Sequence, residues 1–162
     1  MKTKAIAFFM ACSFLSCKPG LPDKKPSYVH SVIDSLKIDK SKNILIYTIN
    51  PNDCINCLVG FVALNNTLST TPIPKVYVLS IEREIEKDQA IKSMKNIDLR
   101  DTVNKVVLWN KEIYIGINET VSLKKAISLS ALTIYNYQKD TVIYNKPIKE
   151  ITGIEEFKTY LE

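Results

Sequence analysis

Residues 43–49, which read Asn-Ile-Leu-Ile-Tyr-Thr-Ile, form an almost unbroken apolar run that constrains the fold more than any other part of the chain. The run has the length of a strand, and its isoleucines favour extended backbone. Because polar and apolar side chains do not alternate, both faces of this strand must be covered, as in a sheet with helices on both sides. The sequence therefore predicts an α/β fold with this strand near the centre of a mixed sheet.

The rest of the chain continues as alternating helical and extended segments. Asp53 is a suitable N-cap for a helix that begins at Cys54, and its predicted buried face consists of Cys57, Phe61, Leu64 and Leu68. Further strands are predicted at residues 75–81, 104–109, 131–137 and 141–145, with an extended segment at 112–117 and a hairpin loop at 138–140. Further helices are predicted at residues 28–36, 82–97 and 121–128, and the second of these has an apolar stripe of Ile81, Ile85, Ile91 and Met94. A last helix is predicted to begin after a Thr152 cap, with Ile154, Phe157 and Leu161 on one face.

Length and composition predict one ordinary globular domain. The chain has 162 residues, of which 46% are hydrophobic and 24% charged, so a disordered polymer, a collagen-like fibre and a polytopic membrane protein are excluded. The net charge is +5, and it falls by two, to +3, without Lys2 and Lys4. Such a mild and well-mixed excess gives no reason to expect a nucleic-acid partner.

The N-terminus is typical of an exported protein. A basic start is followed by an apolar run at residues 5–15, which is too short to span a bilayer but fits a secretory signal. Ser16-Cys17 after that run resembles the lipobox of bacterial lipoproteins, although Phe14 stands where the motif usually has leucine. The resemblance implies that residues 1–16 are a signal peptide and that Cys17 carries the lipid. A plain secretory signal with an incidental cysteine is the alternative.

Residues 17–26 are predicted to be the lipidated cysteine followed by a proline-rich tether. Three prolines and one glycine in residues 18–26 rule out a helix or a central strand and favour an extended spacer. The folded domain is therefore expected at residues 27–162, facing the periplasm of a Gram-negative cell envelope while the lipid anchor binds the membrane.

The cysteines point to redox chemistry. Cys12 is lost with the signal peptide and Cys17 is lipidated, so only Cys54 and Cys57 remain as thiols, in a compartment where thiols are oxidised. A helix N-terminus favours a thiolate. Cys54, nearer the loop, would then be the exposed nucleophile, and Cys57, one turn further, would resolve a mixed disulfide.

A strand, a Cys-x-x-C pair at a helix start, a second strand and helix, a β-hairpin and a C-terminal helix together resemble the thioredoxin-like fold. The nearer likeness is to the membrane-tethered TlpA/ResA-like thiol–disulfide oxidoreductases. The resemblance implies a three-layer fold, an attacking role for Cys54, a resolving role for Cys57 and no cofactor. It also implies an envelope protein as substrate or redox partner.

The chain departs from that family in three respects. Asp53 and Asn56 stand where tryptophan and proline are frequent, and an adjacent carboxylate opposes thiolate formation. Residues 129–132 read Leu-Ser-Ala-Leu where the family has a cis-proline beside the disulfide, so a trans loop is expected. For the family's buried acid the sequence offers only Glu82, which follows the second strand.

Three interpretations of the cysteine pair remain: a redox-active dithiol, a structural disulfide in a non-catalytic interaction module, and metal ligation. A closed zinc site needs four ligands, and the chain adds only His30, far upstream in the first helix. A copper chaperone of the Sco type would use a wider cysteine spacing and a downstream histidine. No metal is therefore predicted.

Overall fold

The computed structural model describes residues 27–53, 55–93, 105–120 and 130–161. Its helices are α1 (Tyr28–Asp34), α2 (Ile55–Leu68), α3 (Glu84–Ser93) and α4 (Lys111–Thr120). Its strands are β1 (Asn43–Ile49), β2 (Lys75–Leu79), β3 (Lys105–Trp109), β4 (Ala131–Asn136) and β5 (Thr141–Pro147). Three short 3₁₀ turns follow, at Ile148–Glu150, Ile154–Glu156 and Lys158–Tyr160. Among these residues, no helix is both long and apolar enough to cross a membrane.

The five strands form one mixed sheet in the order β3-β2-β1-β4-β5. β2 pairs in parallel with both β1 and β3, whereas β4 runs antiparallel to β1 and to β5. The strand predicted at residues 43–49 is therefore the central one, and its residues from Ile44 to Ile49 are all buried. The predicted mixed sheet of an α/β fold is confirmed.

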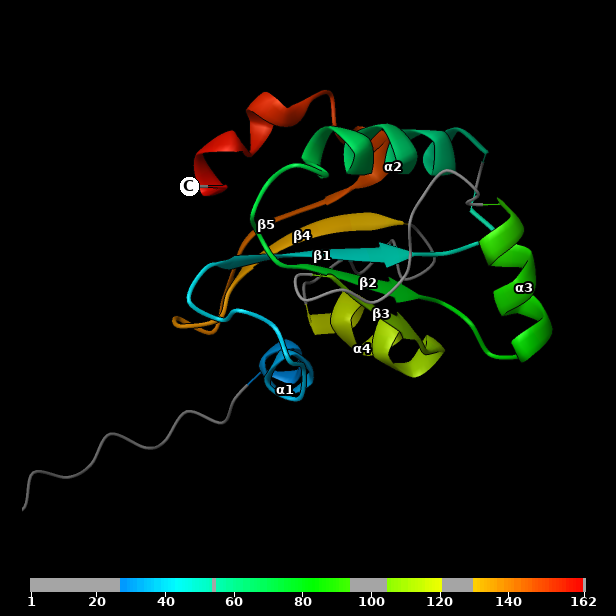
Figure 1. Cartoon of the computed structure of the whole chain (residues 1–162), viewed down its shortest axis with the longest axis horizontal. Helices are drawn as coiled ribbons and strands as arrows, with labels where there is room; N and C mark the ends of the chain where they lie inside the picture. Colours follow the sequence, from blue (N-terminus) through cyan, green and yellow to red (C-terminus); the bar gives the residue numbers. More distant parts are fainter. Residues whose placement is uncertain (1–26, 54, 94–104, 121–129, 162) are drawn as a thin grey trace, which may run out of the picture.

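Helices cover both faces of the sheet (Figure 1). α2 and the C-terminal turns lie on one face, and α1 and α4 lie on the other. Alternate residues of β1 supply the two cores: Leu45 and Tyr47 pack towards α2, and Ile44 and Ile46 pack towards α1 and α4. This is the three-layer arrangement expected of a thioredoxin-like fold.

The extended segment predicted at residues 112–117 is wrong, because those residues belong to α4. The alternation in Glu-Ile-Tyr-Ile-Gly-Ile suggests a strand, but the buried positions are Tyr114, Ile117 and Asn118, which have helical spacing. Asn110 begins the helix, since its side-chain oxygen accepts a hydrogen bond of 2.8 Å from the amide of Ile113. The capping residue and the helical spacing of the buried positions together outweigh the alternation here.

α4 also meets α1 closely at Gly116. A methyl group in place of the Gly116 hydrogen would lie 2.4 Å from the Tyr28 ring, so the absence of a side chain lets the two helices approach.

Two other helix predictions need correction. α3 is described only to Ser93. Of the predicted stripe, Ile81 is buried, Ile85 and Ile91 are exposed, and Met94 lies outside the described residues, so the two stripe positions inside the helix do not face the core. The C-terminal segment forms 3₁₀ turns instead of one helix, and Thr152 is not a cap but donates its hydroxyl to Glu156. Phe157 is nevertheless fully buried, as predicted. The helix predicted at 121–128 lies outside the described residues.

A polar cluster ties Ser27 to the β4–β5 hairpin. Asp140 has a left-handed backbone (φ 45°) and accepts hydrogen bonds from the amide and the hydroxyl of Ser27 and from the hydroxyl of Tyr135. Partial burial by itself raises the pKa of Asp140, but these hydrogen bonds outweigh it and lower the pKa to about 2. Ser27 is therefore tied to the hairpin, and the predicted domain boundary near it stays a prediction.

Two stacked tyrosines in the core provide a matched test of buried hydroxyl groups. The rings of Tyr47 and Tyr77 lie 5.1 Å apart and nearly parallel. The Tyr77 hydroxyl donates to Asn65 at 2.6 Å, whereas the buried Tyr47 hydroxyl has no partner within the described parts of the chain.

We expect Tyr47→Phe to stabilise the protein by about 1 kcal/mol, because it removes a desolvated polar group. Tyr77→Phe should destabilise it by about 1–3 kcal/mol, because the amide of Asn65 is left buried without its partner. Chemical denaturation of the two variants measures both changes. Equal effects of the same sign would show that the Tyr47 hydroxyl is hydrogen-bonded in solution.

Candidate functional site

The cysteine pair lies at the junction between the central strand and α2. β1 ends at Ile49 and α2 begins at Ile55, so Cys57 is in the first turn of a helix that follows the centre of the sheet. Cys54 and the side chain of Cys57 lie outside the described residues. Their sulfur geometry and their attacking and resolving roles therefore stay predictions.

The loop before the pair is held by its own hydrogen bonds. Within residues 50–53, the backbone carbonyl of Asn50 accepts from the amide of Asp53 at 3.0 Å, and its side-chain oxygen accepts from the amide of Asn52, also at 3.0 Å. The amide of Asn50 in turn donates to the Ser130 hydroxyl at 3.1 Å. The loop is therefore a closed turn attached to the residue before β4.

Asp53 provides the second attachment to Ser130. The Asp53 carboxylate accepts a hydrogen bond of 2.8 Å from the Ser130 amide, across 77 positions of sequence. The carboxylate next to Cys54 in the chain is thus held in place by the start of β4. The predicted N-cap role of Asp53 involves residue 54, which is outside the described residues, and stays a prediction.

Ser130 lies in the segment 129–132, where the resemblance to the TlpA/ResA-like proteins leads one to expect a cis-proline. Its amide donates to Asp53, and its carbonyl accepts from the amide of Ile148 at 2.9 Å. The described peptide bonds from Ser130 to Leu132 are trans, as expected; Leu129 is outside the described residues. Both backbone groups of Ser130 are therefore used inside the domain.

α4 brings a buried tyrosine towards the same loop. Tyr114 is only 2% exposed. Burial raises its pKa far above the usual value, and the negative charge of Asp53 raises it further. The Tyr114 hydroxyl therefore stays protonated, and the charge of Asp53 contributes to this.

Glu82, the candidate for the buried acid, is not buried. Its side chain is 65% exposed, and it forms an ion pair with Lys111 at 2.8 Å. The acid that the structure brings to the start of α2 is Asp53.

The His30 side chain contacts two tyrosines. Its Nδ1 lies 3.1 Å from the hydroxyl of Tyr135, and its ring stacks on Tyr137 with centroids 4.3 Å apart. In the described part of the chain, no group of three or more His, Cys, Asp or Glu side chains is arranged to hold a metal ion.

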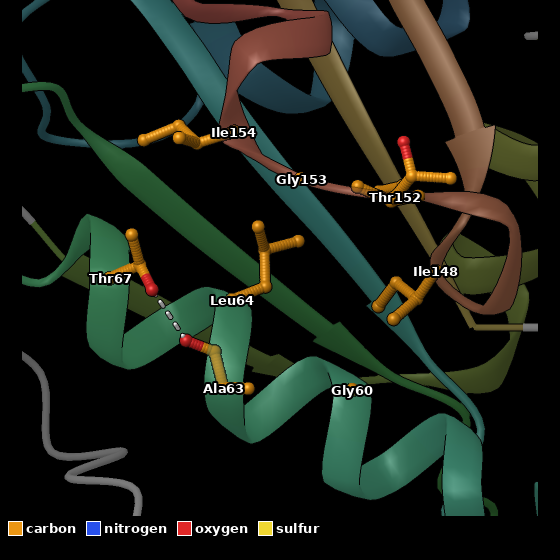
Figure 2. A pocket seen from close by; sticks show the side chains of 9 residues that line it. Gly60, Ala63, Leu64, Thr67, Ile148, Thr152, Gly153 and Ile154 are labelled. Atoms are coloured by element: carbon orange, nitrogen blue, oxygen red, sulfur yellow. Dashed lines mark hydrogen bonds between the residues drawn. The ribbon is translucent and has the colours of Figure 1, made fainter.

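An apolar cavity of about 360 Å³ lies between α2 and the C-terminal segment (Figure 2). It begins at Gly60, one helical turn beyond Cys57. The hydroxyl of Thr67 on its wall donates to the carbonyl of Ala63, so that polar atom is already used. The lining residues are Gly60, Ala63, Leu64, Thr67, Ile148, Ile151, Thr152, Gly153 and Ile154.

Comparison with known proteins gives matches only among solved structures, since no family model and no curated protein matches the chain. StoA from Bacillus subtilis is 16% identical, with a TM-score of 0.45 over 76% of this chain and 85% of that one. A secreted disulfide oxidoreductase of Mycobacterium tuberculosis, homologous to E. coli DsbE, is 13% identical, with a TM-score of 0.47 over 75% and 81%. The thioredoxin domain of a thiol-disulfide oxidoreductase from Bacteroides vulgatus is 15% identical, with a TM-score of 0.44 over 74% and 77%.

The strand order and the two helical layers define this chain as a thioredoxin-like α/β domain. Sequence reasoning proposed the cysteine pair between strand and helix as the site, and this stays a prediction. It did not foresee the hydrogen bonds of Ser130 or the buried position of Tyr114. The missing proline was the only signal that drew attention to Ser130. Tyr114 was hidden by the wrong interpretation of α4 as an extended segment.

Proposed function

We propose that this protein is a membrane-anchored, thioredoxin-like lipoprotein that exchanges disulfides with other proteins of the cell envelope through Cys54 and Cys57. The observation that carries the proposal is the position of the pair. The chain leaves the central strand, makes a turn tied to the start of β4 by Asn50 and Asp53, and enters α2 at the cysteines. The N-terminus of a helix favours a thiolate.

The proposed reaction is a balanced exchange of two electrons. The Cys54 thiolate attacks one sulfur of a substrate disulfide, forms a mixed disulfide and releases the other substrate sulfur as a thiolate. The Cys57 thiolate then attacks the Cys54 sulfur and releases the second substrate thiolate. The substrate disulfide gains two electrons, the cysteine pair loses two, and the released thiolates take up protons from solvent. A dithiol donor restores the reduced pair, and the reverse sequence oxidises a substrate.

The anchor is part of the proposal. Lipid on Cys17 and the tether at residues 18–26 would hold the domain near the membrane, facing the periplasm of a Gram-negative cell. Ser27, tied to Asp140, is the point at which the tether joins the folded domain.

A non-catalytic interaction module is the second candidate, and a specific observation favours it. Both backbone groups of Ser130 are engaged within the domain, so a partner segment cannot pair there without displacing them. In this case the cysteine pair would be a structural disulfide at the start of α2.

The reduction potential of the pair separates the two candidates. The test uses the full chain in detergent, equilibrated in glutathione buffers, with alkylation read by mass spectrometry on the peptide that carries both cysteines. For an exchange enzyme we expect a potential between about −270 and −120 mV and faster alkylation of Cys54 than of Cys57 near neutral pH. A potential well below about −300 mV, with both thiols inert after reduction, would identify the interaction module.

A further inference from the structure

The structure gives Asp53 an attachment that the sequence does not reveal. Its carboxylate accepts the Ser130 amide at 2.8 Å, and its own amide donates to the carbonyl of Asn50 at 3.0 Å. The residue is therefore fixed on both sides, by its side chain to the start of β4 and by its backbone to the turn. Cys54 is the next residue in the chain, so the carboxylate and this cysteine are neighbours in sequence.

The negative charge of the Asp53 carboxylate changes the pKa of a nearby side chain. After burial, the Asp53 charge is the second cause that raises the pKa of Tyr114 on α4. A negative charge that disfavours a tyrosinate in this way also disfavours a thiolate on the neighbouring residue.

We propose that Asp53 is a positioning residue that ties the Cys54 loop to the start of β4 and uses its charge to lower the reduction potential of the Cys54–Cys57 pair. The inference rests on the proposed exchange function. The hydrogen bond from the Ser130 amide to the Asp53 carboxylate ties the loop to the segment 129–132, which lacks the proline that the resemblance leads one to expect.

The Asp53 charge lowers the reduction potential because only the reduced form of the pair contains a thiolate, which the charge destabilises. Oxidation removes two electrons from the pair and releases its protons, and the resulting disulfide carries no charge that the carboxylate can oppose. The reduced form is most stable where a Cys54 thiolate is stabilised, so a nearby negative charge weakens the reduced form relative to the disulfide. Asp53 exchanges neither electrons nor protons in this step.

Asp53→Asn tests the charge while keeping a side-chain oxygen that can accept from the Ser130 amide. In the full chain we expect the midpoint of Cys54 alkylation against pH to fall by about one unit. The equilibrium constant with glutathione should shift about tenfold towards the dithiol, which corresponds to about 30 mV.

Asp39→Asn is the matched control. It removes the same charge in the segment before β1, roughly 20 Å away because the seven residues of the strand rise by about 3.3 Å each. We expect this variant to keep the wild-type alkylation midpoint and glutathione equilibrium.

Asp53→Ala separates the attachment from the charge. It should give the same shift in potential as Asp53→Asn and, in addition, at least about tenfold faster hydrogen exchange of the Ser130 amide, because that amide loses its acceptor. Thermal unfolding of each variant verifies that it is folded before its potential is measured.

The outcomes separate the inference from the proposed function. If wild-type protein exchanges with glutathione but Asp53→Asn stays within twofold of Asp39→Asn, the role of Asp53 is refuted while the exchange function stands. If wild-type protein does not exchange at all, both are refuted. A shift of the Asp53→Asn equilibrium towards the disulfide would also overturn the inference, because its sign is opposite to the expected one.

Discussion

Replacing Phe157 by alanine is expected to lower the free energy of unfolding by about 3–5 kcal/mol, the usual cost of removing a large aromatic ring from a core. The Phe157 side chain is fully buried in the core under α2. Its ring also contacts that of Tyr144, with centroids 5.1 Å apart. Since a domain is commonly stable by only about 5–15 kcal/mol, this loss is a large share of the total.

The loss should be large because Phe157 anchors its whole segment. It lies between two 3₁₀ turns of three residues each, and such turns are too short to be stable on their own. Without the ring, the segment that forms one wall of the cavity beside α2 would lose its main contact with the core. Urea denaturation followed by circular dichroism measures the change.

Tyr160→Ala is the matched control, because it removes an aromatic ring from the same segment at a side chain that is 37% exposed. We expect it to cost less than about 1.5 kcal/mol. The anchoring role of Phe157 would be contradicted if the two substitutions lowered stability equally.

The sequence predicts most of the sheet because its strands are marked by composition. Residues 43–49 became β1 with the predicted bounds, since an apolar run of that length has few alternatives to a central strand. The prediction for residues 112–117 failed because isoleucines at every second position suit a strand, while Asn110 and the spacing of the buried residues favour a helix. Where two periodicities compete, tertiary burial decides.

The candidate site was predicted only in its local part. A cysteine pair after a central strand can be recognised from adjacent residues, so the sequence could propose Cys54 and Cys57 as the site, which stays a prediction. The bond from Asp53 to Ser130 joins residues 77 positions apart, and no pattern in either neighbourhood encodes it. Such contacts arise from strand order, which places β4 beside β1, and they become visible only in the folded chain.

The largest effect on activity is expected at the cysteines. Cys54→Ser should lower the rate of disulfide exchange by about 10³-fold or more, the scale on which removal of a covalent nucleophile slows an enzyme. A serine hydroxyl does not form the thiolate that attacks a disulfide at neutral pH. The rate is measured with a short peptide that contains one intramolecular disulfide, with dithiothreitol as the electron donor.

Cys57→Ser is the informative counterpart, because it should stop the reaction at a different step. Cys54 can still attack the peptide, but no second thiolate releases the product, so a mixed disulfide at Cys54 should accumulate. Mass spectrometry of the intact protein would show one added peptide in Cys57→Ser and none in Cys54→Ser or in the double variant. Adducts on Cys57 in the Cys54→Ser protein would reverse the assigned roles. Absence of any adduct, with wild-type protein also inactive, would leave the cysteine pair as a structural disulfide.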